Sequence, residues 1–138
     1  MSISFKNFER ENILSLNDFL NVGISHPVIQ YSLSFMSNGF SVKQIFEAEP
    51  LDLEYLLDGL TYLRDNLKGT FVFEPVISGR INIKFEMSNQ GHISISGVIF
   101  DKLHSISLVF KFSTDQTFLP DLISQCATTI KSLNKINN

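Results

Sequence analysis

The chain has 138 residues, a net charge of −3 and 43% hydrophobic residues, which include 13 phenylalanines but no tryptophan. This length suits one domain spanning residues 1–138, and the apolar content excludes a disordered chain. The 11 lysines and arginines are scattered along the sequence, which argues against direct binding of RNA or DNA, because nucleic-acid binders usually carry a basic face.

The N-terminal part of the chain is predicted to consist of strands. Residues 2–8 and 13–19 each suit one short strand. Between residues 27 and 36 apolar side chains alternate with polar ones, which places them on one face of a strand. These alternating residues are Ile29, Tyr31, Leu33 and Phe35. Asn38-Gly39 then suits a type I′ turn, so residues 40–47 are predicted to return as the second strand of a hairpin.

A central helix is predicted from leucines at helical spacing. These are Leu53, Leu56, Leu57, Leu60, Leu63 and Leu67. Pro50 is expected to end the preceding strand, Asp52 to cap the helix and Gly69 to stop it. Gly59 inside the helix costs about 1 kcal/mol relative to alanine, a cost that close packing on the sheet would explain.

Four further strands and a final helix are predicted after Gly69. The strands are centred on Phe71 and Phe73, on residues 81–87, on residues 93–99, where Gly97 allows a bulge, and on residues 106–112. The helix is expected to start between Asp115 and Pro120, with Asp115 or Thr117 as its cap. Its apolar stripe comprises Leu119, Leu122, Ile123, Cys126, Ile130 and Leu133, and residues 134–138 are expected to form a frayed tail.

Together these elements predict an α+β fold. We expect a curved antiparallel sheet of about six to eight strands, with the central and C-terminal helices packed on it. No internal repeat is evident in the sequence.

No local motif for catalysis or metal binding is present. His26, His92 and His104 each lie more than four residues from any other histidine or from the single cysteine, so no zinc-ligand spacing occurs. Cys126 cannot form an internal disulfide, and it falls on the apolar stripe of the last helix. We therefore expect no catalytic residues, no metal, no cofactor and no enzymatic activity. A site assembled in space from distant segments stays open at this stage.

One acidic stretch stands out in the charge pattern, with five carboxylates and no base. It consists of Glu47, Glu49, Asp52, Glu54 and Asp58. One interpretation is a solvated edge with favourable acids in the first turn of a helix. The other is a patch that binds a basic partner and speeds its association. We take these five residues as the candidate partner-binding site.

The sequence resembles a known family near its C-terminus. Residues 110–120, FKFSTDQTFLP, followed by Asp121-Leu122-Ile123, resemble the C-terminal motif of the WapI-type immunity protein family. In that family a strand of alternating aromatics runs into an Asp-Gln-Thr-aromatic-Leu-Pro turn and a final helix. Residues 91–97 resemble the strand that precedes the motif, and residues 52–69 resemble the family's central helix. The resemblance covers roughly residues 28–130.

This resemblance implies a protein that neutralises a toxin made by the same bacterium. Such toxins are often the C-terminal domains of large contact-dependent surface proteins, and several are nucleases. It implies a cytoplasmic protein that occludes the toxin's active or substrate-binding surface, and we expect a monomer before binding. The sequence start lacks the pattern of a signal peptide, and no apolar run is long enough to span a membrane, which agrees with that location.

Two alternatives remain. An acidic secretion chaperone for an effector protein would share the size and charge, although such chaperones typically open with a helix and dimerise through a sheet. A small enzyme or ligand-binding domain would need a deep pocket with convergent polar groups.

Overall fold

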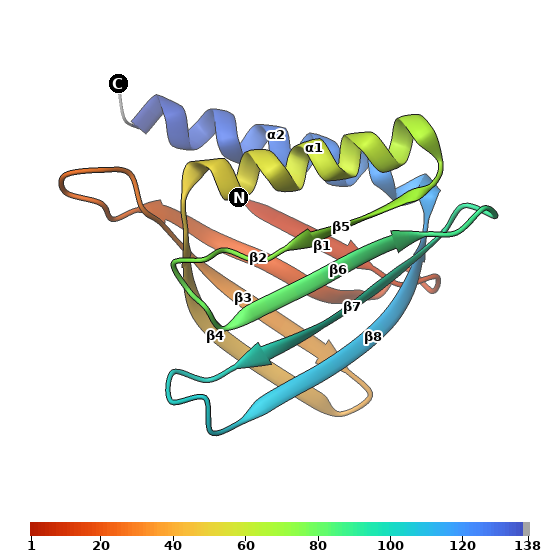
Figure 1. The fold of residues 1–138 in the computed structure, drawn as a ribbon, viewed down its shortest axis with the longest axis horizontal. Helices are drawn as coiled ribbons and strands as arrows, with labels where there is room; N and C mark the ends of the chain where they lie inside the picture. Colours follow the sequence, from red (N-terminus) through yellow and green to blue (C-terminus); the bar gives the residue numbers. More distant parts are fainter. Residues whose placement is uncertain (137–138) are drawn as a thin grey trace.

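The computed structural model describes residues 1–136, which form two successive units of four strands and a helix. The first unit comprises β1 (Ser2–Lys6), β2 (Asn12–Asn21), β3 (Ile29–Ser37), β4 (Phe40–Ala48) and α1 (Pro50–Asn66). The second comprises β5 (Gly69–Phe73), β6 (Ile81–Met87), β7 (His92–Phe100), β8 (Ser107–Asp115), the short 3₁₀ helix η1 (Gln116–Phe118) and α2 (Leu119–Ile136). The α+β prediction is confirmed (Figure 1).

The eight strands form two antiparallel sheets in place of the single sheet that was predicted. Each sheet has four strands in chain order, β1-β2-β3-β4 and β5-β6-β7-β8. The repeat of four strands and a helix was not evident in the sequence, because it is a repeat of element order. In the part of the chain that the structure describes, no helix is long and apolar enough to cross a membrane.

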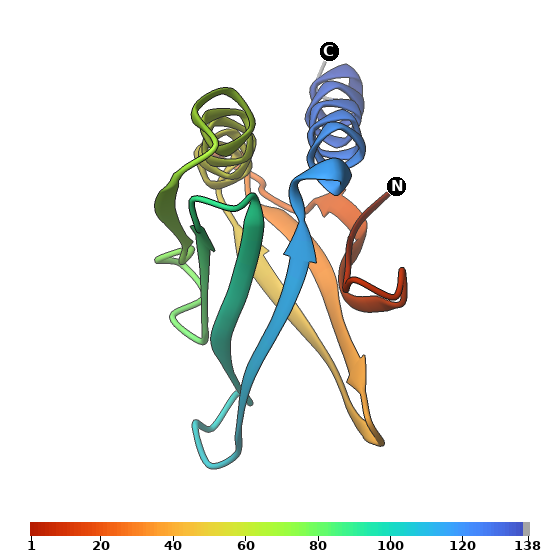
Figure 2. The same cartoon turned by 90° about the vertical axis from the view of Figure 1, so that its right-hand side faces the viewer.

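The core lies between the apolar faces of the two sheets and below the helices. The alternation predicted for residues 29–35 is confirmed, since all four apolar side chains are buried. The sheets meet through aromatic pairs: the Phe5 and Phe85 ring centroids lie 5.5 Å apart, and those of Phe35 and Phe110 lie 5.0 Å apart. Both helices lie at one end of the sheets, and the β3–β4 and β7–β8 turns lie at the other (Figure 2).

Each helix packs against the first strand of the opposite sheet. α1 follows the first sheet but contacts β5, and α2 follows the second sheet but contacts β1 and β2. Gly59 makes the first contact possible, because a Cβ there would lie 2.5 Å from the Phe71 ring. At the second contact, the Ser4 backbone N–H donates to Gln125 Oε1 over 2.8 Å. The two units are therefore interlocked through their helices.

A loop from the second unit covers part of the free edge of β4. The Ser78 hydroxyl accepts from the Glu47 N–H at 3.0 Å and also donates to the Glu47 carbonyl. Arg80 donates to the Ile45 carbonyl at 2.7 Å and to the Phe100 carbonyl at 3.2 Å, with its guanidinium 4.5 Å from the centre of the Phe46 ring. The β5–β6 loop thus bonds to β4 much as a neighbouring strand would.

Two local predictions about the central helix, its cap and its stop, are wrong. Glu49 is the N-cap in place of Asp52, and Pro50, which follows the end of β4 as predicted, is the first helical residue. A proline suits this position because its fixed φ is helical and the first-turn N–H that it lacks would have no helical partner. At the other end the Leu67 N–H still donates to the Leu63 carbonyl, but the left-handed backbone of Leu67, with φ of 56°, ends α1, and Gly69 already begins β5.

The turn and bulge predictions had different outcomes. Asn38 and Gly39 both have positive φ, 51° and 84°, as a type I′ turn requires, so that turn is confirmed. The bulge that Gly97 allows is absent, because β7 keeps an unbroken register with both neighbouring strands. Gly97 instead permits close approach, since a Cβ there would lie 2.2 Å from the Asn82 carbonyl oxygen. α2 extends to Ile136, so the prediction of a frayed tail is wrong for residues 134–136. The remaining predicted tail residues, 137–138, lie outside the described part.

Candidate functional site

The acidic stretch spans the junction between β4 and α1, where part of it is used to start the helix. The Asp52 carboxylate accepts from the Glu49 N–H at 2.7 Å, and the Asp52 N–H donates to the Glu49 carbonyl at 2.9 Å. Asp52, predicted as the N-cap, is therefore the third helical residue and bonds back to the cap. Glu47 is exposed at the end of β4, where its backbone bonds to Ser78.

The remaining carboxylates of the stretch lie on the outer face of α1. Glu54 and Asp58 are exposed and four residues apart, so they share one face of the helix. Two tyrosines that the sequence reasoning missed are exposed on the same helix, Tyr55 at 71% and Tyr62 at 52%. The sequence did contain one signal for them: the two tyrosines are seven residues apart, a spacing that places both side chains on the same face of a helix. Exposed tyrosines beside carboxylates suit a protein-binding surface, because tyrosine is enriched at interfaces.

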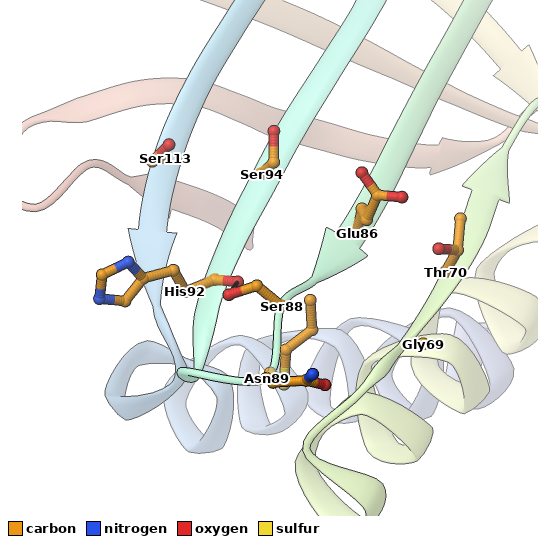
Figure 3. Close-up of a pocket in the computed structure, with 9 residues that line it drawn as sticks. Gly69, Thr70, Glu86, Ser88, Asn89, His92, Ser94 and Ser113 are labelled. Carbon is orange, nitrogen blue, oxygen red and sulfur yellow. Dashed lines mark hydrogen bonds between the residues drawn. The ribbon is translucent and has the colours of Figure 1, made fainter.

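A hollow of about 440 Å³ lies on the outer face of the second sheet. Thr70, Glu86, Ser94 and Ser113 occupy one register row across its four strands and project to the same side (Figure 3). Within this hollow His92 points away from Glu86 (Figure 3), and its ring packs edge-on against Phe8 at 5.2 Å. The hollow is open, and it lacks the convergent acid and base that hydrolytic or transfer chemistry needs.

The other groups capable of chemistry are separated or buried. Residues 1–136 contain no group of three or more His, Cys, Asp or Glu side chains that could hold a metal ion. Burial raises the pKa of the Cys126 thiol to about 12, and its Sγ lies 3.7 Å from the Leu53 carbonyl oxygen. A thiol with this pKa stays protonated near neutral pH and is a poor nucleophile. The ring of His104 stacks on Phe100 at 5.1 Å.

The segment that carries the family resemblance performs a structural task. The Asp115 carboxylate accepts from the Thr117 N–H at 3.2 Å and so caps η1, which leads into α2. The Gln116 N–H donates to the Gly91 carbonyl at 3.0 Å, and a Cβ at Gly91, whose φ is 78°, would lie 2.8 Å from Cδ of the Gln116 side chain. Two motif segments that are distant in the sequence, residues 91–97 and 110–120, therefore meet at this turn. Asp115, one of the two residues predicted to cap the last helix, thus caps the short η1 that precedes that helix.

A solved structure shares the fold. It is described as the structure of the plant transcriptional regulator PBF-2, with a TM-score of 0.50 and 12% sequence identity over 99% of this chain and 82% of that chain. At this identity the match shows a common fold and nothing about activity. No curated protein matches the chain.

A family model matches most of the sequence. It describes the immunity protein WapI-like family and covers residues 26–134, which contain β3 to β8, α1 and all but the last two residues of α2. The resemblance expected over roughly residues 28–130 is thus confirmed over nearly the same stretch, and the chain belongs to the WapI-like immunity protein family.

Proposed function

We propose that this chain neutralises a bacterial toxin domain by binding it, without chemistry of its own. The observation that carries the proposal is the family match over residues 26–134. The arrangement of side chains agrees with it: the hollow on the second sheet is open and has no convergent acid and base, and Cys126 is buried. Inhibition by binding needs only a stable surface that complements the toxin.

The partner that fits this proposal is a basic nuclease domain made by the same bacterium. Its active or substrate-binding surface is positively charged, because it must attract phosphates. Glu47, Glu54 and Asp58 are exposed carboxylates that can meet such a surface, and Tyr55 and Tyr62 supply contact area beside them. The chain would act in the cytoplasm, as a monomer that forms a one-to-one complex. It would occlude the surface that the toxin's substrate needs.

Co-expression tests the proposal directly. The toxin domain encoded next to this chain's gene should arrest growth when expressed alone, and growth should recover when this chain is present. A matched control is an unrelated immunity protein expressed at the same level, which should not rescue. Failure of this chain to rescue, with both proteins present and folded, would contradict the proposal.

Charge reversal tests the acidic patch separately. Glu49 and Asp52 are poor targets, since they form the start of α1. The double variant Glu54→Lys/Asp58→Lys should slow association with a catalytically inactive toxin domain by about tenfold at low salt, and the effect should shrink as salt screens the charges. The matched control reverses Glu74 and Glu86, which are exposed outside α1. Equal rates for both double variants would remove the patch from the proposal and leave the immunity function standing.

The assembly state distinguishes the chaperone alternative. Secretion chaperones of the acidic class dimerise through a sheet. Sedimentation of the purified protein should give a monomer. A stable dimer that binds an effector and does not protect cells from a toxin would favour the chaperone.

A further inference from the structure

We propose that the free edge of β8 binds an extended strand of the toxin domain, which adds to the second sheet as a fifth strand. This inference rests on the proposed function and adds a second contact surface to the acidic patch of α1. It starts from the four edges of the two sheets. α2 lies against β1, α1 lies against β5, and Ser78 and Arg80 bond to β4. Within residues 1–136 no segment pairs with the outer side of β8, which ends the order β5-β6-β7-β8.

The direction of the β8 backbone groups follows from the bonds of β7. The Phe100 N–H donates to the Arg80 carbonyl, so the backbone of Phe100 faces β6 and that of Ile99 faces β8. Ile99 pairs with Leu108, and backbone groups alternate sides along a strand. Val109, Lys111 and Ser113 therefore present their N–H and C=O groups to the free side. Such a row is a template for another strand.

A groove runs beside this edge. Two adjoining hollows of about 390 and 270 Å³ share Ser37, Asn38 and Lys111 in their walls. β8 forms one wall. The β3–β4 turn and the β1–β2 loop form the other. Because the groove follows the strand, its shape suits an extended segment better than a helix or a small compact ligand.

The walls of the groove indicate the side chains of its occupant. At one end Phe40, which is 66% exposed, and Leu108 leave an apolar surface that has no cover within the described residues. At the other end Glu9 and Glu11 line the wall. The occupant is therefore an extended protein segment with an apolar residue near Phe40 and a basic residue near the two glutamates. The same carboxylates would repel a phosphate backbone, which disfavours nucleic acid as the occupant.

Amide hydrogen exchange resolved by residue tests the pairing. The probe is the catalytically inactive toxin domain encoded next to this chain's gene. On binding, exchange at the Val109, Lys111 and Ser113 amides should slow at least about tenfold, because these groups gain partners. The amides of Leu108, Phe110 and Phe112 already pair with β7 and provide the internal control. Binding without this alternating protection would overturn the inference and leave the proposed function intact.

A proline substitution removes one donor from the free edge. Lys111→Pro should weaken toxin binding by about tenfold, since an edge strand pairs through its N–H groups and proline has none. Ser41→Pro is the matched control, because its N–H lies on the free side of β4, beyond the part that Ser78 and Arg80 cover. Circular dichroism checks that both variants are folded, and Glu9→Lys supplies a second variant that leaves the β8 backbone unchanged and should also weaken binding.

The remaining outcomes are also informative. If the toxin domain does not bind the wild-type chain at all, both the proposed function and this inference fail. If the alternating protection is present without the toxin and depends on protein concentration, a second copy of the chain occupies the edge, and the inference is overturned. Protection that follows addition of single-stranded DNA or RNA in place of the toxin would overturn it as well.

Discussion

The two units of this protein share one order of elements but treat their last strands differently. In the first unit the edge of β4 is bonded by Ser78 and Arg80, which come from the β5–β6 loop of the second unit. In the second unit β8 has no such cover in the described chain. The difference teaches that a repeated topology does not determine which edge strand stays unpaired. Here the β5–β6 loop determines it, because Ser78 and Arg80 bond to β4 and nothing equivalent bonds to β8 in the described chain.

The two units also depend on each other for their helices. α1 needs the close approach at Gly59 to reach Phe71 of the second sheet, while α2 reaches the first sheet beside Ser4. An isolated unit would expose the apolar face of its sheet, because the core is shared between the two sheets. We therefore expect the chain to unfold as one cooperative domain.

The largest effect is expected from a substitution that disrupts the second sheet at its closest approach. Gly97→Val would place a Cβ against the Asn82 carbonyl oxygen and the Phe110 ring, and overpacking of this kind should cost about 3 kcal/mol of unfolding free energy. Ser96→Val is the matched control, because Ser96 is on the opposite face of β7. Urea denaturation followed by circular dichroism measures both. A loss at Gly97 no larger than at Ser96 would contradict the close approach.

A smaller effect is expected from uncovering the β4 edge. Arg80→Ala removes bonds to the Ile45 and Phe100 carbonyls and the contact with the Phe46 ring, which should cost about 2 kcal/mol. The variant would also loosen the β5–β6 loop, so exchange at the Glu47 amide of β4, which donates to Ser78 of that loop, should quicken. Lys84→Ala is the control, since its bridge to Glu86 spans 3.8 Å between exposed groups and should contribute little. Unchanged exchange at the Glu47 amide would show that Arg80 is not a cover for this edge.

The smallest effect concerns the contact between the two helices and depends on pH. Burial raises the pKa of Cys126 from an ordinary value of 9.0 to about 12. A raised folded-state pKa stabilises the protein fully below pH 9, and that contribution is lost as pH rises towards 12, because the unfolded thiol ionises first. The wild type should lose about 1 kcal/mol between pH 9 and pH 10 relative to Cys126→Ala. This pH interval limits the contribution of Tyr31 ionisation to the measured stability. The ordinary pKa of Tyr31 is 10.0, and burial raises it.

The measurement is urea denaturation of both proteins at several pH values. Cys126→Ala will be less stable at pH 7 through lost packing, so only the difference in slope with pH is informative. Parallel pH profiles would indicate that the thiol is accessible to water and that the helices do not seal it.

Local structure could be predicted from the sequence wherever one periodicity dominates. The alternation at residues 29–35 gave a buried face, Asn38-Gly39 gave the turn, and the leucine spacing gave α1. The errors lie at boundaries. Asp52 and Glu49 are both acids near a proline, and either can start a helix, so only the folded backbone shows which one does. The Gly97 error has the same origin, because a glycine in a strand fits a bulge or a close approach equally well.

The candidate site was less predictable than the fold. The five acids of the stretch from Glu47 to Asp58 were visible as charges, but their division into capping and free carboxylates depends on where α1 begins. Tyr55 and Tyr62 were passed over, since exposure cannot be read from residue type. The β8 groove involves residues 7–13, 35–40 and 108–113, which no local pattern brings together.

By itself, the sequence determined which segments are strands and which are helices, and its motif at residues 110–120 pointed to the family that the full comparison shows. These features are local, since they follow from the alternation of side chains and from turn chemistry over a few residues. Only the tertiary structure decided that the strands divide into two sheets, that each helix covers the other unit, and that β8 stays open. Those outcomes depend on contacts between residues far apart in the chain, where hydrogen bonding and shape at one edge are set by a loop from elsewhere.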